Sequence, residues 1–191
     1  MSETAATALS GVLPVFQTPY LADEAIDFET LAHEIDWLFH QGADGIVMAM
    51  VSEVLRLSDR EREQLAAQAC LLASGKGPSI ISVGAESSPV AEQHARHAEE
   101  YGATAVMAIP PVSIQVEEKE LLDYYRRLLE VIEIPVIVQD ASGYVGKAMS
   151  IAFQARLLDE FGPDRVLFKP EASPIGPRLS ALRDATGGKA R

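Results

Sequence analysis

Short apolar runs rich in β-branched residues alternate along this chain with longer segments of helical periodicity, and this alternation limits the possible folds most strongly. It is typical of parallel α/β architecture, in which each helix returns the chain to the start of the next strand. The sequence predicts strands over residues 12–17, 45–50, 79–84, 105–109, 136–140 and 166–169. It predicts helices over residues 28–41, 59–74, 89–101, 117–132 and 150–161, with a further helix-like stretch near 177–185.

An internal repeat supports this interpretation. Residues 42–50 and 102–110 both read as a helix-ending glycine followed by a strand, and they lie two units of about 30 residues apart, the usual size of a βαβ step. The (β/α)8 barrel and the doubly wound open sheet both repeat such a unit. No G-x-G-x-x-G follows the first predicted strand, which argues against a dinucleotide-binding open sheet. A complete barrel takes about 250 residues. In the barrel version, the 191 residues are a single partial domain, an incomplete TIM (β/α)8-type barrel of about six βα units that ends within the following helix.

The charge of the chain excludes some partners. A formal net charge of -12 argues against nucleic-acid binding, which needs a basic face to neutralise phosphates. No apolar run approaches the length of a membrane span, and no basic segment leads into an apolar stretch at the start. We therefore expect a soluble, cytoplasmic protein that binds neither nucleic acid nor membrane.

Lys169 ends the last predicted strand and is followed by Pro170 and Glu171. Lysine is rarely buried without a partner, and an amine held in apolar surroundings is the nucleophile of Schiff-base enzymes. The alternative is that Lys169 reaches solvent from the strand end or pairs with Glu171, and the strand alone favours neither. Other unusual residues also follow predicted strands, at the edge where parallel α/β folds bind ligands. They are Val51, Ser52, Glu53, Pro110, Gln139 and Asp140.

Several of these motifs together resemble the dihydrodipicolinate synthase and N-acetylneuraminate lyase family. They are the opening Gly-Val-Leu-Pro-Val-Phe-Gln-Thr-Pro at 11–19, the loop ending in Glu53, Ile134-Pro135 before the fifth strand, Gly146 after it, and the Lys169 strand. The family is built on a barrel and uses a lysine on its sixth strand to form a Schiff base with a 2-keto acid. Lys169 lies on the sixth predicted strand, so the count of strands and the resemblance agree.

The departures from the family pattern narrow the expected activity. The usual Gly-Thr-Thr-Gly-Glu loop is replaced by Ala-Met-Val-Ser-Glu at 49–53, the strand-five tyrosine falls on Gln139, and a second tyrosine falls near Val112. The resemblance is therefore greater to the branch that includes 2-keto-3-deoxy-L-arabonate dehydratase, which keeps the lysine and lacks the strand-five tyrosine. It implies a hydro-lyase for a small 2-keto-3-deoxy sugar acid that uses no metal or organic cofactor and forms a homo-oligomer.

The resemblance also suggests individual roles. We expect the Val51 and Ser52 backbone N–H groups and the Ser52 hydroxyl to bind the substrate carboxylate, unless Ser52 only makes a turn hydrogen bond. The candidates for general acid–base catalysis are Glu171, Glu53, Asp140 or a water molecule. Gln139 and Asp140 point to opposite faces of a strand, which favours Gln139 for orienting the substrate and Asp140 for anchoring the next loop.

Three alternatives to the dehydratase remain at this stage. An imine on Lys169 would equally serve retro-aldol cleavage or a dihydrodipicolinate synthase-like aldol condensation. The third alternative is a catalytically inactive, truncated barrel fragment, whose open sheet edges would invite pairing with other chains.

Overall fold

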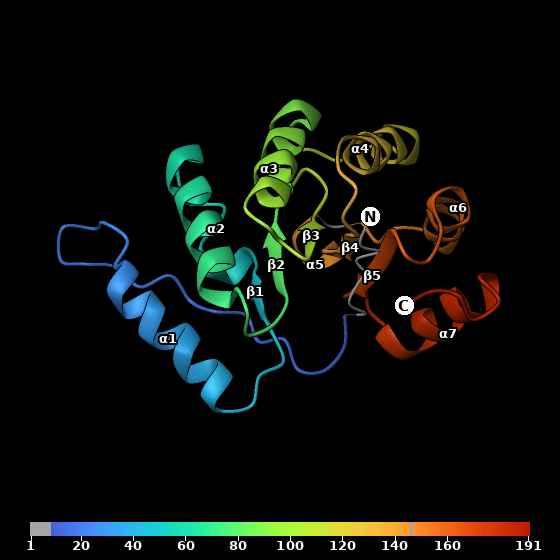
Figure 1. The fold of residues 1–191 in the computed structure, drawn as a ribbon. Coiled ribbons are helices and arrows are strands. Elements are labelled where there is room, and N and C mark those ends of the chain that lie inside the picture. Colours follow the sequence, from blue (N-terminus) through green and yellow to red (C-terminus); the bar gives the residue numbers. More distant parts are fainter. Residues whose placement is uncertain (1–8, 146) are drawn as a thin grey trace, which may run out of the picture. The chain divides into compact units, whose positions relative to one another are not determined.

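A computed structural model describes residues 9–145 and 147–191, which fall into two compact units. The first unit contains Met1–Ser82 and Glu100–Thr104, and the second contains Val83–Glu99 and Ala105–Arg191. Figure 1 shows the elements coloured in chain order. Each unit is taken in turn below. The single partial domain expected over residues 1–191 stays a prediction.

The first unit contains helices α1 and α2, the 3-10 turn η1 and two parallel strands. Their bounds are α1 Phe28–His40, β1 Ile46–Met48, η1 Met50–Ser52, α2 Asp59–Ala73 and β2 Ser79–Ser82. Val47 of β1 is paired with Ile80 of β2. Ser58 caps α2 in a capping box, because its hydroxyl accepts the Glu61 N–H and the Glu61 carboxylate accepts the Ser58 N–H. Fully buried apolar side chains from both helices and both strands form the core of this unit.

The strand expected over residues 12–17 is present only as a single parallel bridge between Val15 and Val47. Val47 donates its N–H to the Pro14 carbonyl, and Phe16 donates to the Val47 carbonyl. Pro14 has no N–H to give to a ladder, which limits the pairing on this segment. The expectation of six ladder strands was therefore wrong for the described residues, which form five strands and this bridged segment.

The second unit contains three parallel strands, β3, β4 and β5, which lie side by side in Figure 1. Ala108 of β3 is level with Val138 of β4, and Val138 is level with Phe168 of β5. The element bounds are α3 Ser88–Glu100, β3 Ala105–Ala108, α4 Glu118–Val131, β4 Val136–Asp140, α5 Ser142–Val145, α6 Ile151–Phe161, β5 Val166–Pro170 and α7 Ile175–Ala185. Tyr125 and Leu157, both fully buried, bring α4 and α6 into the core.

In both units the strands are parallel and helices alternate with them. The expected fold class is confirmed: the chain is an α/β protein with the units of an incomplete (β/α)8-type barrel. Two one-turn elements, η1 and α5, were not expected, because a single turn is too short to show helical periodicity. Among the described residues, no helix has both the length and the apolar character that crossing a membrane requires.

Candidate active site

Lys169 lies on β5 directly level with Gln139 on β4. Its Nζ atom is 3.0 Å from Glu171 Oε1, and the Lys169 side chain is 41% exposed. The ion pair considered from the sequence is therefore present, and the amine is not deeply buried. A pair with this exposure contributes little to folding stability. Its more important effect is to hold the amine beside a carboxylate.

Gln139 completes this group of side chains. It is 3% exposed, and its Nε2 donates to Glu171 Oε2 at 2.8 Å. The two oxygens of Glu171 therefore contact two different residues, Lys169 and Gln139. Gln139 Oε1 is buried and has no hydrogen-bond partner among the described residues. A buried carbonyl oxygen without a donor is unfavourable, so this atom is an acceptor suited to a ligand hydroxyl.

Glu171 follows the last residue of β5 and still contacts the side chain two positions before it. Lys169 and Glu171 therefore lie on one face, as the period of two along an extended segment requires. We call Lys169, Glu171 and Gln139 the lysine triad.

Asp140 lies on the opposite side of β4 from Gln139, as the alternation of side chains predicts. It accepts hydrogen bonds from Arg178 Nη2 of α7 at 3.3 Å and from the Met149 N–H at 3.4 Å. Burial raises the pKa of Asp140, and the Met149 bond and the Arg178 charge oppose that rise. These contacts fit the anchoring role expected for Asp140, and its place among the substrate-binding residues stays a prediction.

Pro110 also lies away from the triad. It is buried after β3 and lines a small pocket of about 30 Å³ together with Leu121 of α4 and Met149. Counting on from Ala108 puts residue 110 level with Asp140, on the face that carries Asp140. The expectation that Pro110 binds substrate stays a prediction.

The loop after β1 lies in the first unit. Ser52 is fully buried, its hydroxyl donates to the Phe16 carbonyl at 2.6 Å, and its N–H donates to the Ala49 carbonyl at 2.9 Å. Both of its expected carboxylate donors are therefore used inside the protein, which supports the turn role for Ser52. Val51 is exposed, and Glu53 has a left-handed φ of 65° and pairs with Arg56. The lysine triad lies in the second unit, and the expected substrate-binding roles of Val51 and Glu53 stay predictions.

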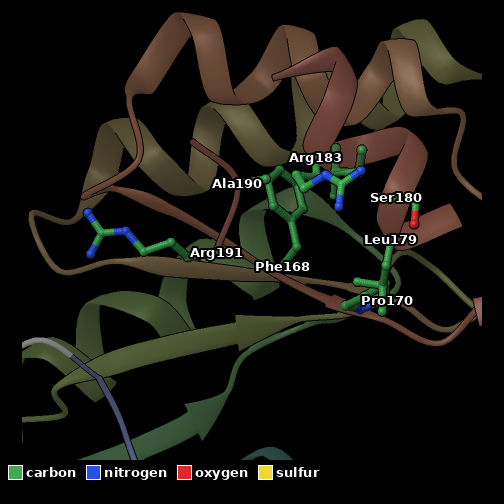
Figure 2. Close-up of a pocket in the computed structure, with 8 residues that line it drawn as sticks. Phe168, Pro170, Leu179, Ser180, Arg183, Ala190 and Arg191 are labelled. Carbon is green, nitrogen blue, oxygen red and sulfur yellow. The ribbon is translucent and has the colours of Figure 1, made fainter. Parts of the chain in front are cut away.

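A larger hollow lies on the other face of β5 from Lys169. Figure 2 shows Phe168 and Pro170 of β5 with Leu179 and Arg183 of α7 around this pocket of about 290 Å³. Since side chains alternate along a strand, Lys169 points away from it. The pocket is therefore separate from the lysine triad.

Sequence reasoning missed Arg178 as the partner of Asp140. The two residues are 38 positions apart. An arginine on a helix carries no local signal for a particular distant carboxylate, so only the spacing of two predicted elements could have suggested the contact.

Comparison with known proteins connects this geometry to a family. Residues 8–162 match the dihydrodipicolinate synthetase family. The chain is 30% identical over 154 residues to L-2-keto-3-deoxyarabonate dehydratase of Azospirillum brasilense, covering 78% of this chain and 50% of that protein. It is 28% identical over 149 residues to the Escherichia coli (strain K12) protein named "Probable 2-dehydro-3-deoxy-D-pentonate aldolase YjhH", with the same coverage. The chain thus spans about half the length of these curated relatives.

A solved structure is similar over nearly the whole chain. It is chloride-inhibited dihydrodipicolinate synthase from Acinetobacter baumannii complexed with pyruvate, which matches with a TM-score of 0.87 and 28% identity. The match covers 94% of this chain and 61% of that one. The similarity therefore extends beyond residue 162 and includes the strand that carries Lys169.

Proposed function

Because the chain belongs to the dihydrodipicolinate synthetase family, we propose that it is a Schiff-base-forming lyase for a 2-keto acid, with Lys169 as the nucleophile. The observation that carries the proposal is the lysine triad, in which Glu171 lies 3.0 Å from the Lys169 amine and 2.8 Å from the Gln139 amide. The reaction needs no metal or organic cofactor, because the protonated imine is itself the electron sink.

We assign the first proton transfer to Glu171. The Lys169 amine must lose a proton before its lone pair can attack the keto carbon, and Glu171 Oε1 is within hydrogen-bond reach. The nitrogen forms a bond to the keto carbon, and the carbonyl oxygen leaves as water after taking up two protons. The cationic imine that remains withdraws electrons from the adjacent carbon, so a proton on C3 becomes removable.

For the substrate we propose a 2-keto-3-deoxy sugar acid, and for the reaction a dehydration. After C3 loses its proton, the electron pair forms a C3–C4 double bond and the C4 hydroxyl leaves as water. Two observations support this choice. One relative is named a keto-deoxyarabonate dehydratase, and Gln139 Oε1, which has no hydrogen-bond partner among the described residues, suits a substrate hydroxyl.

Retro-aldol cleavage is the second candidate, since another relative of similar identity is named an aldolase. It uses the same imine but breaks the C3–C4 bond, which releases an aldehyde. Aldol condensation in the manner of dihydrodipicolinate synthase would run through the same imine in the opposite direction.

Borohydride trapping tests the imine. The 191-residue protein is incubated with pyruvate and sodium borohydride, and its intact mass is measured. We expect one covalent increment, which peptide mapping locates on Lys169. A protein that gains no mass would refute the proposed function. A product assay with the sugar acid then separates a dehydrated semialdehyde from pyruvate plus an aldehyde.

Ser52→Ala tests whether the loop after β1 binds the substrate carboxylate. We expect the variant to lose about 1–3 kcal/mol of folding free energy, because the buried Phe16 carbonyl and Ala49 N–H lose their partner. We expect the KM for the keto acid to stay unchanged, since the hydroxyl is already used inside the protein. Thermal unfolding and steady-state kinetics measure the two effects.

Thr18→Val is the matched control for Ser52→Ala. It removes another buried hydrogen bond of the same loop, from Thr18 Oγ1 to the Ser52 carbonyl at 2.7 Å, and leaves the Ser52 hydroxyl in place. A KM that rises about tenfold in Ser52→Ala but not in Thr18→Val would restore the carboxylate-binding role.

A further inference from the structure

In the second unit, the segment that follows β2 runs beside the end of β3. The Val83 N–H donates to the Met107 carbonyl at 2.8 Å. Gly84 packs so closely on Ile109 that a Cβ atom added to it would lie 2.7 Å from the Ile109 nitrogen. The Tyr124 hydroxyl of α4 accepts the Ala85 N–H at 3.0 Å. These contacts fix the segment up to the residue before Glu86.

Glu86 then holds the loop that follows β3. One oxygen of its carboxylate accepts the Val112 N–H at 3.0 Å, and the other accepts the Ser113 N–H at 3.1 Å and the Ser113 hydroxyl. Burial raises the pKa of Glu86, but these hydrogen bonds outweigh it and the pKa is lowered. The charged carboxylate is thus the form that the loop stabilises.

Packing contributes little to the position of this loop. Ser113, Ile114 and Gln115 are exposed, and Ile114 is 62% exposed. From Ser113 to Gln115 the loop buries no side chain, and an exposed segment of this kind is ordinarily mobile. Here three hydrogen bonds to one carboxylate hold it, and bonds to charged groups are the stronger kind.

The loop lies at the edge of the sheet where Lys169 also lies. Ala108 of β3, Val138 of β4 and Phe168 of β5 are level, so Lys169 and Gln139 are level with residue 109. Val112 and Ser113 come three and four residues later, beyond the carboxyl ends of the strands. In barrels of this type, the loops at that edge form the rim of the substrate site.

We propose that Glu86 is a positioning residue for the keto-acid site, whose carboxylate holds the Val112–Ser113 loop in the conformation that binds substrate. The inference rests on the proposed function. When only a fraction of molecules have the binding conformation, the ligand concentration needed for half-saturation rises by the inverse of that fraction. Releasing the loop therefore weakens keto-acid binding without changing the amine that reacts.

Glu99 provides a matched control. Its carboxylate also accepts two loop N–H groups, from Glu133 at 2.7 Å and Ile134 at 3.1 Å. That loop precedes β4 and so lies at the amino ends of the strands, the opposite edge from Lys169. Glu86→Ala and Glu99→Ala thus each remove a carboxylate that holds a loop, with three hydrogen bonds at one edge of the sheet and two at the other.

The experiment measures how borohydride trapping of the full chain depends on pyruvate concentration. For Glu86→Ala we expect the half-saturating concentration to rise about tenfold, with the same extent of trapping at saturation. For Glu99→Ala we expect no change. For Glu86→Gln, whose amide oxygen still accepts one N–H, the half-saturating pyruvate concentration should rise only about threefold.

The inference would be overturned, while the proposed function stands, if the half-saturating pyruvate concentration is unchanged in Glu86→Ala or rises equally in Glu99→Ala. A wild-type protein that traps no pyruvate would refute the proposed function and the inference with it. If Glu86→Ala does not fold, Glu86→Gln decides, and wild-type half-saturation in that variant would overturn the positioning role.

Discussion

Replacing Lys169 with methionine is expected to abolish the pyruvate adduct that borohydride traps. Methionine is similar in length and lacks the amine, so no imine can form. Loss of a covalent nucleophile usually lowers turnover by about 10³-fold or more, and we expect a loss of that size for the sugar acid. Intact mass after borohydride treatment and a product assay measure the two effects.

Lys169→Arg separates the ion pair from the chemistry. The guanidinium keeps a positive charge beside Glu171, but it stays protonated and does not act as a nucleophile. We therefore expect Lys169→Arg to unfold near the wild-type temperature and to trap no pyruvate.

Lys119→Met is the control for a lysine outside the triad, since Lys119 is exposed on α4. It should trap pyruvate as the wild-type protein does. Equal trapping by Lys169→Met and the wild-type protein would show that Lys169 only forms an ion pair with Glu171.

The sequence predicted most of the strands because buried parallel strands are short apolar runs between polar turns. The range 136–140 was predicted with the bounds that β4 has, and four of its five residues are buried. The range 12–17 was predicted by the same pattern but forms a single bridge, since Pro14 cannot donate to a ladder. Local pattern thus finds an extended segment, and backbone donors decide whether it becomes a strand.

Part of the candidate site followed from the sequence in the same way. A period of two placed Gln139 and Asp140 on opposite faces of one strand, and the contacts agree. Partners far along the chain could not be predicted. The Ser52 hydroxyl bonds to Phe16, 36 positions earlier, and Glu86 holds a loop 26 positions later. Such contacts depend on how whole elements pack, and no neighbouring residue signals them.

Arg178→Met is expected to destabilise the protein by about 3 kcal/mol, because it leaves the Asp140 carboxylate buried without its charged partner. The Asp140 side chain is 3% exposed, and Arg178 also donates to the Met149 carbonyl. For a chain of this length, that loss lowers the unfolding temperature by about 6–12 °C.

Arg183→Met on the same helix is the control. Arg183 is exposed and pairs only with its neighbour Asp184 among the ion pairs of the described residues, so its loss should change stability by less than about 1 kcal/mol.

The penalty of Arg178→Met should also depend on pH. Burial already raises the pKa of Asp140 in the folded protein, and the Arg178 charge opposes that rise, so the variant raises the pKa further. A carboxyl with a raised folded pKa destabilises the protein where it must be charged, and this penalty disappears as pH falls below that pKa. We therefore expect the difference in unfolding temperature between wild type and variant to be largest near pH 7 and to shrink toward about pH 4. An Asp140→Asn background has no carboxylate charge that could be left without a partner. There, the change in unfolding temperature caused by Arg178→Met should be smaller and independent of pH. An equal difference at both pH values in the Asp140 protein would show that Arg178 acts through the Met149 carbonyl rather than through the Asp140 charge.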